Sequence, residues 1–218
     1  MYLGILHMYA TLPSDTWKFV GGKIEGQLAY SFDGAHWLRS LREPLMKNES
    51  PFAGLLFTTD MRVDNDGSVL LYASGTDLEH GYFAEGDPAI GVFRLREDNF
   101  VHLRAAGEGR LRTRETLLKS HFDINLGCKR ATCALFTPEG SPLEGFGHGD
   151  CVPFSGDATH WTPEFRGDTA SLAGRVVTIE VRLTDGCVYG INGDFVKMIN
   201  TEAWRFEKFG TLPDSSNP

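Results

Sequence analysis

The chain has 218 residues, a formal net charge of −8 and 41% hydrophobic residues, which is the composition of a globular protein that buries a core. The negative charge argues against a nucleic acid or an anionic membrane as partner, because either would have to find a basic patch against the overall field. The densest basic segment, 104–114, spreads its arginines along what reads as an exposed strand, and we interpret it as a solvated face. No apolar run approaches the roughly 20 residues that span a bilayer, so we expect no membrane segment.

Residues 1–10 form a largely apolar strand and carry neither the basic region nor the cleavage site of a secretion signal, which favours a cytoplasmic location. The abrupt start on a core-like strand also suggests a truncated or abbreviated relative of a longer protein. The cysteines contain no CxxC pair, and no histidine follows them at zinc-finger spacing. We therefore expect reduced thiols, no metal and no cofactor. These cysteines are Cys128, Cys133, Cys151 and Cys187.

Hairpins occupy the first half of the chain. The segment 24–31 (IEGQLAYS) alternates with period two and ends in a tight turn at Asp33-Gly34, after which Trp37 begins the return strand. Up to Arg104, no window keeps the spacing of an amphipathic helix. Further strands are predicted at 55–63, 68–74, 89–96 and 100–104.

The second half contains the clearest strand, 171–183, which places Val177, Ile179, Val181 and Leu183 on one face. Asp185-Gly186 is predicted to close a hairpin onto the following CVYGI. Shorter strands are predicted at 112–118, 121–126 and 130–136. This half reads as an antiparallel sandwich with one face of each sheet buried.

Several motifs together resemble the C-terminal portion of glycoside hydrolases of families 32 and 43. The most specific are LAYSFDGAHWLR, AIGVFRLREDNFVHLRA, LFTPEGSPLEGF and LAGRVVTIEVRLTDGCVYGI. The resemblance spans Met1 to about Ile191. In these families a five-bladed β-propeller precedes a β-sandwich, so the resemblance implies an all-β fold. Late propeller blades would occupy 1–106, an antiparallel β-sandwich 107–209 and a disordered tail 210–218.

The resemblance implies hydrolysis of O-glycosidic bonds and a carbohydrate partner. The segment before Arg104 has room for about two blades at four strands each, so the family's early-blade carboxylate has no counterpart. We expect a truncated or degenerate glycoside-hydrolase-like protein. The alternative is a non-catalytic carbohydrate-binding or assembly module. Its open sheet edges would pair with a second copy or with a missing N-terminal propeller half.

Glycoside cleavage requires two carboxyl groups that face each other across one sugar bond. Glu25 and Asp60 are the candidates, although Glu25 fits a solvent-facing strand residue equally and Asp60 a strand-end turn acid. The glycine-flanked loop after 68–74 supplies further polar candidates, and the aromatic ones are also compatible with a core role. The candidate substrate-binding residues are Gln27, Trp37, Tyr72, His80, Tyr82 and Glu85.

Overall fold

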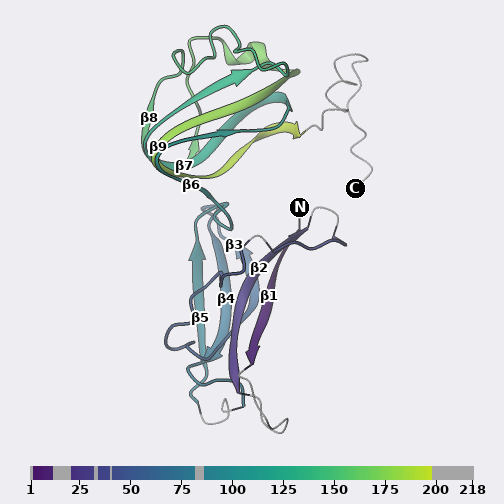
Figure 1. Ribbon diagram of the computed structural model, residues 1–218, viewed down its shortest axis with the longest axis vertical. Coiled ribbons are helices and arrows are strands. Elements are labelled where there is room, and N and C mark those ends of the chain that lie inside the picture. Colours follow the sequence, from purple (N-terminus) through teal and green to yellow (C-terminus); the bar gives the residue numbers. More distant parts are fainter. Residues whose placement is uncertain (1, 12–20, 32–33, 40, 82–85, 198–218) are drawn as a thin grey trace. The chain divides into compact units, whose positions relative to one another are not determined.

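The computed structural model describes residues 2–11, 21–31, 34–39, 41–81 and 86–197, and every structural statement below refers to these residues. The chain divides into two compact units, Met1–Phe100 and Val101–Pro218, whereas the sequence suggested a boundary after residue 106. The described residues are all-β, as predicted: each unit contains one sheet, and the remaining regular element is a 3-10 helix, η2 (Thr169–Leu172) (Figure 1).

The first unit contains a five-stranded sheet of order β1-β2-β3-β4-β5. β1 and β2 pair antiparallel, β3 to β5 form an antiparallel meander, and β2 meets β3 in parallel at Ile24 and Leu55 (Figure 1). The strands are β1 (Tyr2–Thr11), β2 (Gly22–Ser31), β3 (Leu55–Val63), β4 (Val69–Thr76) and β5 (Ala89–Leu95).

The chain returns along β2 after the turn at Gly34, but as isolated bridges rather than a regular strand. Tyr30 and Leu38 exchange two backbone hydrogen bonds of 2.9 Å each, and the Leu45 amide donates to the Gly26 carbonyl at 2.8 Å. The return begins at Leu38, one residue after the predicted start at Trp37. Leu38 and the segment 44–45 thus lie along β2, next to the β1–β2 pair.

Alternation along β4 locates the core of the first unit. Val69, Leu71 and Ala73 are buried, whereas the residues between them are only partly covered. Successive side chains of a strand point to opposite faces, so one face of the meander packs on the core. The other buried members of this core are Met46, Phe52 and Leu56.

The second unit contains a four-stranded sheet of order β6-β9-β7-β8. The residue numbers of the paired positions fall along β9 as they rise along β7. The pairing extends from Phe122 opposite Gly193 to Phe136 opposite Thr178. Thr116 is in register with both Val177 and Lys197, so the start of β7 lies between the two ends of β9 and the sheet curls (Figure 1). The strands are β6 (Leu103–Arg112), β7 (Thr116–Phe136), β8 (Phe154–Trp161) and β9 (Arg175–Lys197).

Asp185-Gly186 does not close a hairpin, so this prediction was wrong. β9 continues through both residues to Lys197, and the register with β6 shifts there in a β-bulge. Asp185 has a φ of 44°, and its carboxylate accepts from the Gly107 amide at 2.7 Å and from Lys129 Nζ at 2.8 Å. These cross-strand bonds satisfy the Asp185 carboxylate, so the backbone bends without reversing.

The predicted inward face of β9 is confirmed: Val177, Ile179, Val181 and Leu183 are all buried in the core of the second unit. The opposite face is not simply solvated, because Glu180 is also 0% exposed. Within the described ranges, no helix has the length and apolar character needed to cross a bilayer.

Candidate functional site

A polar network lies on one face of the β1–β2 pair. Glu25 and Gln27 are two residues apart on β2 and share that face, and Met8 stands opposite Glu25 on β1. Gln27 Nε2 donates to Glu25 Oε1 at 2.8 Å. Arg39 Nη1 donates to Gln27 Oε1 at 3.2 Å and contacts Met8 Sδ at 3.4 Å. The network therefore combines a carboxylate, an amide and a guanidinium group.

Two exposed aromatic rings continue this face. The Trp37 ring covers Gly4, since a Cβ on Gly4 would lie 3.0 Å from it, and Trp37 Nε1 donates to the Gly34 carbonyl at 3.1 Å. The Tyr2 ring lies beside Gly34, 3.5 Å from the position of an added Cβ. Trp37 is 47% and Tyr2 54% exposed. We call this surface the Trp37 face; it comprises Tyr2, Met8, Glu25, Gln27, Trp37 and Arg39.

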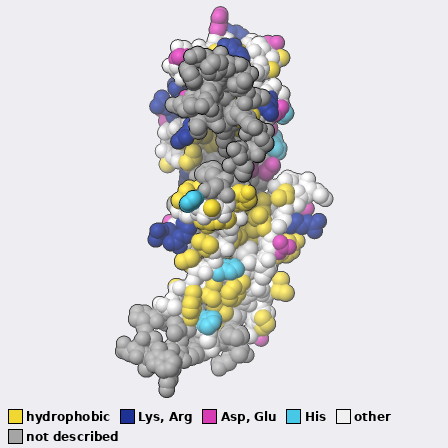
Figure 2. Space-filling model, turned by 90° about the vertical axis from the view of Figure 1, so that its right-hand side faces the viewer, with side chains coloured by type: hydrophobic (Ala, Val, Ile, Leu, Met, Phe, Trp, Pro, Cys, Tyr) yellow, Lys and Arg dark blue, Asp and Glu magenta, His cyan; other side chains and the backbone are white. Residues whose placement is uncertain are grey.

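The Trp37 face combines the two elements that sugar recognition requires. Aromatic rings bury the apolar C–H face of a sugar, and the Glu25 carboxylate and Arg39 guanidinium can bind its hydroxyls, while the buried Gln27 amide holds these two groups in place. Figure 2 shows other hydrophobic side chains, interspersed with histidines, on the exposed surface of the first unit. The sequence identified Glu25, Gln27 and Trp37 as candidates but missed Tyr2 and Arg39. Arg39 ends the motif LAYSFDGAHWLR, but nothing in the motif shows that its side chain reaches Gln27.

Asp60 is not opposite Glu25. It is in register with Tyr72 across a β-bulge, and its Oδ1 accepts from the Met61 amide at 2.8 Å. Asp60 and Leu28 line the same cavity of about 210 Å³. Leu28 is three residues beyond Glu25 on β2, so its side chain points to the opposite face of the strand. Asp60 therefore lies on the side of β2 that faces away from Glu25, and the two candidate carboxylates do not face each other.

His80 also lies apart from the Trp37 face. Its Nδ1 is 3.2 Å from the Tyr9 hydroxyl, and the two rings are 5.1 Å apart between centroids. Tyr9 is in register with Ile24, whose side chain points away from the face that carries Glu25. The other two candidates of that loop, Tyr82 and Glu85, lie outside the described residues.

The second unit contains a charged cluster that sequence reasoning missed. Arg112 Nε and Nη2 contact Glu180 Oε2 at 2.8 and 2.6 Å, and Arg182 Nε donates to Glu180 Oε1 at 3.0 Å. His148 Nε2 lies 3.1 Å from the same Oε1, and its Nδ1 lies 2.9 Å from Thr132 Oγ1. The Arg112 guanidinium also stacks over the Phe136 ring, 4.0 Å from its centroid.

The cluster shifts the protonation of its members. Burial alone would raise the pKa of Glu180, but hydrogen bonds from His148 and Arg112 and the charge of Arg112 hold that pKa below its usual value. Burial lowers the pKa of His148, the Glu180 hydrogen bond opposes this shift, and the charge of Arg182 adds to it. At neutral pH the cluster therefore contains an ionised Glu180 and a neutral His148.

One feature of the sequence could have indicated this cluster: the alternation of apolar and charged residues along 171–183. The outward-facing residues of the strongest strand include Glu180 and Arg182, which a one-sided strand would expose to solvent. Arg112 lies 68 residues before Glu180, and His148 lies 32 residues before it. Cross-strand register pairs Arg112 with Glu180, whereas His148 lies in a turn between β7 and β8. A single sequence shows neither placement.

Among the described residues, no three histidine, cysteine, aspartate or glutamate side chains gather in a way that could hold a metal ion. The four cysteines are unbridged; Cys133 and Cys151 are buried, and the Cys133 amide donates to Cys151 Sγ at 3.3 Å. Comparison of the chain with family models, with curated proteins and with solved structures finds no match.

Proposed function

We propose that this chain is a carbohydrate-binding relative of the family 32 and 43 glycoside hydrolases, in truncated or degenerate form, and that it binds saccharides without cleaving them. The proposal joins the motif resemblance to the Trp37 face. It favours the non-catalytic alternative over hydrolysis, because Glu25 and Asp60, the two carboxylates that hydrolysis would use, lie on opposite sides of β2.

The arrangement of the first unit supports the propeller part of this proposal. β1, β2 and the bridges at Leu38 and Pro44 form one antiparallel group, and β3, β4 and β5 form a second. The two groups are in register at a single pair, Ile24 and Leu55. So little pairing between two antiparallel groups suits two blades, each an antiparallel sheet of its own, better than one continuous sheet. In the second unit, the curl of β7 and β9 is compatible with the two layers of a sandwich.

The observation that carries the proposal is the continuity of the exposed Trp37 and Tyr2 rings with the Glu25–Gln27–Arg39 network. Two exposed rings on one face, with a polar network on the same face, suit a hydroxylated ligand better than an apolar one. The tie between Trp37 Nε1 and the Gly34 carbonyl holds the ring in position before a ligand arrives.

Isothermal titration of the purified chain against neutral oligosaccharides tests this function. We expect Trp37→Ala to weaken binding about tenfold, the equivalent of roughly 1.4 kcal/mol of stacking. Tyr9→Ala is the matched control, because it removes a 39% exposed ring from the other face of β1. Failure of every neutral oligosaccharide to bind, or equal weakening by both variants, would overturn the proposal.

The same proposal predicts that the chain does not hydrolyse aryl glycosides. Cleavage needs an acid and a base or nucleophile about 5–10 Å apart on the two sides of one bond. The Glu25 carboxylate instead accepts a hydrogen bond from Gln27, and the Asp60 carboxylate accepts one from the Met61 amide. Release of the chromophore from a panel of aryl glycosides provides the measurement. Turnover that disappears in Glu25→Gln would show that the chain is an enzyme.

A further inference from the structure

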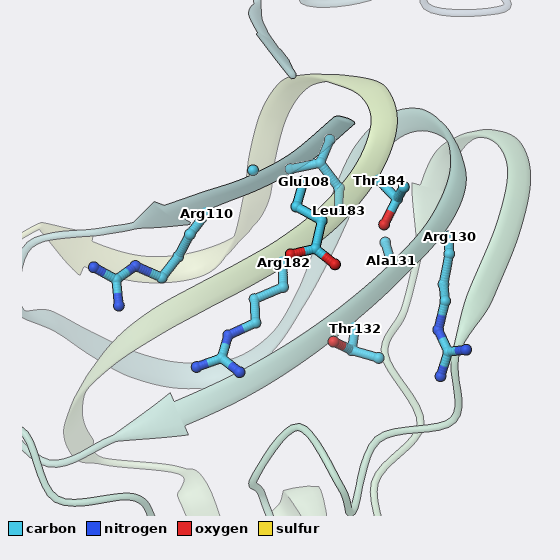
Figure 3. Close-up of a pocket in the computed structure, with 9 residues that line it drawn as sticks. Glu108, Arg110, Arg130, Ala131, Thr132, Arg182, Leu183 and Thr184 are labelled. Atoms are coloured by element: carbon cyan, nitrogen blue, oxygen red, sulfur yellow. The ribbon is translucent and has the colours of Figure 1, made fainter. Parts of the chain in front are cut away.

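The polar face of the second sheet contains a groove of about 590 Å³, within the size range of small-molecule sites. Three adjacent strands line it: β6, β9 and β7. Figure 3 shows Arg110 at one margin, Arg130 at the other and Arg182 between them. The polar lining residues are Glu108, Arg110, Arg130, Thr132, Arg182 and Thr184.

Cross-strand register arranges these side chains in rows. Arg110 is in register with Arg182, which is in register with Thr132. The next row consists of Glu108, Thr184 and Arg130. Directly opposed residues share a face, so both rows present their side chains to the groove.

The adjoining row closes one end of the groove. Arg112 and Glu180 are in register there, and Glu180 is 0% exposed. Glu180 binds Arg182 Nε, which holds the stem of Arg182 in place while its side chain remains 55% exposed. His148 fixes Thr132 from the other side through their 2.9 Å contact. The floor of the groove is therefore anchored by the buried cluster.

The groove is basic in a chain that is acidic overall. It holds three arginines against one glutamate, whereas the whole chain has a net charge of −8. Across the described residues, the guanidinium groups of Arg110 and Arg130 have no hydrogen-bonding or ion-pair partner. Arg110 also stands directly opposite Arg182, and like charges in that arrangement oppose folding. Arg110 and Arg130 are both exposed, so their guanidinium groups are accessible to an anion, and an anion between Arg110 and Arg182 would relieve their repulsion.

Glu108 and the threonines narrow the chemistry of that anion. A bare anion would gain from the arginines but would meet the Glu108 carboxylate, which repels it. A ligand with both a carboxylate and hydroxyl groups matches the arginines and Glu108 together. Its carboxylate accepts hydrogen bonds from the guanidinium groups. Its hydroxyls donate to Glu108 or exchange hydrogen bonds with Thr132 and Thr184. We propose that this groove binds a hydroxylated carboxylate, of which a uronic acid is the example tested below. The site is separate from the Trp37 face and does not depend on it.

Titration of the full chain with galacturonate, followed by calorimetry at low salt, tests the proposal. We expect galacturonate to bind, and galactose and acetate each to bind at least tenfold more weakly, because each carries only half of the recognised chemistry. Arg110→Gln and Arg130→Gln should each weaken galacturonate binding about tenfold, as expected for a charged hydrogen bond. Arg104→Gln is the matched control, since Arg104 is an exposed arginine of the same strand β6 that does not line the groove.

Three results would overturn the proposal: acetate or inorganic phosphate binding as tightly as galacturonate, galactose binding as tightly as galacturonate, or an equal effect of Arg104→Gln and the groove variants. Glu108→Gln is expected to weaken galacturonate binding and to leave phosphate binding unchanged or stronger; the opposite pattern would also contradict it. Trp37→Ala keeps this test distinct from the previous one, because it should weaken neutral oligosaccharide binding and leave galacturonate binding unchanged.

Discussion

The carboxylate of Glu180 has no exposure to solvent, yet it remains ionised because Arg112, Arg182 and His148 surround it. A buried charge of this kind costs several kcal/mol of desolvation, which its partners must offset. If one partner is removed, the remaining charges stay buried or half-buried without compensation. At the residue scale, Glu180 is therefore the position at which a small chemical change has the largest expected effect on stability.

Glu180→Gln keeps the shape of the side chain but removes the charge that Arg112 and Arg182 face. We expect it to lower the free energy of unfolding by roughly 3 kcal/mol, the lower end for a broken buried pair, because both arginines are partly exposed. Urea denaturation should show a lower midpoint with an unchanged slope. Glu108→Gln, on the same face but exposed, is the control and should change stability by less than about 0.5 kcal/mol. Equal effects would mean that Glu180 is not a specific anchor.

His148 makes the same cluster sensitive to acid. Its pKa is lower in the folded chain than in the unfolded one, where it is about 6.5. The stability that this difference contributes is present above pH 6.5 and is lost as the pH falls through the folded value. The pKa of Glu180 is also lowered, so its contribution disappears in turn at pH values below about 4.3.

We therefore expect the free energy of unfolding to fall between pH 7.5 and pH 5, before most carboxylates titrate. His148→Gln should flatten that part of the profile, because it removes the titrating imidazole and keeps a hydrogen-bonding group near Thr132 and Glu180. Urea titrations at half-unit pH intervals provide the measurement. A slope in the variant as steep as in the unchanged chain would assign the acid sensitivity to other groups.

At the scale of elements, sequence patterning located two of the shorter strands well. The predicted segment 55–63 coincides with β3, and 24–31 lies within β2. It failed where strands run on without interruption. The short strands predicted at 121–126 and 130–136 belong to one strand, β7, and β9 continues through Asp185-Gly186 opposite a bulge in β6. Asp185 stays within the strand because neighbouring strands supply hydrogen-bond donors to its carboxylate. These donors, the Gly107 amide and Lys129 Nζ, are distant from it in sequence.

The candidate sites show the same difference between local and long-range information. Glu25, Gln27 and Trp37 come from one hairpin, and local sequence was enough to group them. The groove draws on β6, β7 and β9, so segment 104–114 read as a solvated face although Arg110 borders a basic groove. Residues that function together across strands are grouped by register, which is a long-range property of the fold.

Gly186 tests the packing of the bulge. A Cβ at this position would meet the Gly127 carbonyl oxygen at 2.5 Å and Cys128 Cα at 2.7 Å, and these backbone atoms cannot move without disturbing β7. We expect Gly186→Ala to destabilise the second unit by about 1–3 kcal/mol, as overpacking does. Gly149→Ala is the control, since no described atom lies within 4 Å of the added Cβ. Thermal unfolding compares the two, and equal melting temperatures would show that the bulge is loosely packed.

For the molecule as a whole, the exposed edge of the first sheet matters most. β5 is a terminal strand of that sheet, and in the part of the chain that the structure describes no further strand pairs with it. Its residues Ile90 and Val92 are 87% and 54% exposed. An edge with unpaired backbone groups and apolar side chains is a template for pairing with another strand, and a second copy of the chain offers the same edge.

We therefore expect the chain to self-associate reversibly as its concentration rises. Light scattering coupled to size exclusion should show an apparent mass that increases with loading. Ile90→Lys combined with Val92→Lys should return the mass to that of the monomer, because a lysine on an edge strand opposes pairing with an identical edge. Val152→Lys is the control, since Val152 is 56% exposed and belongs to the second unit, outside the sheet that contains β5. A constant monomer mass at every concentration would mean that the β5 edge does not recruit another copy, and the assembly role would then be abandoned in favour of carbohydrate binding alone.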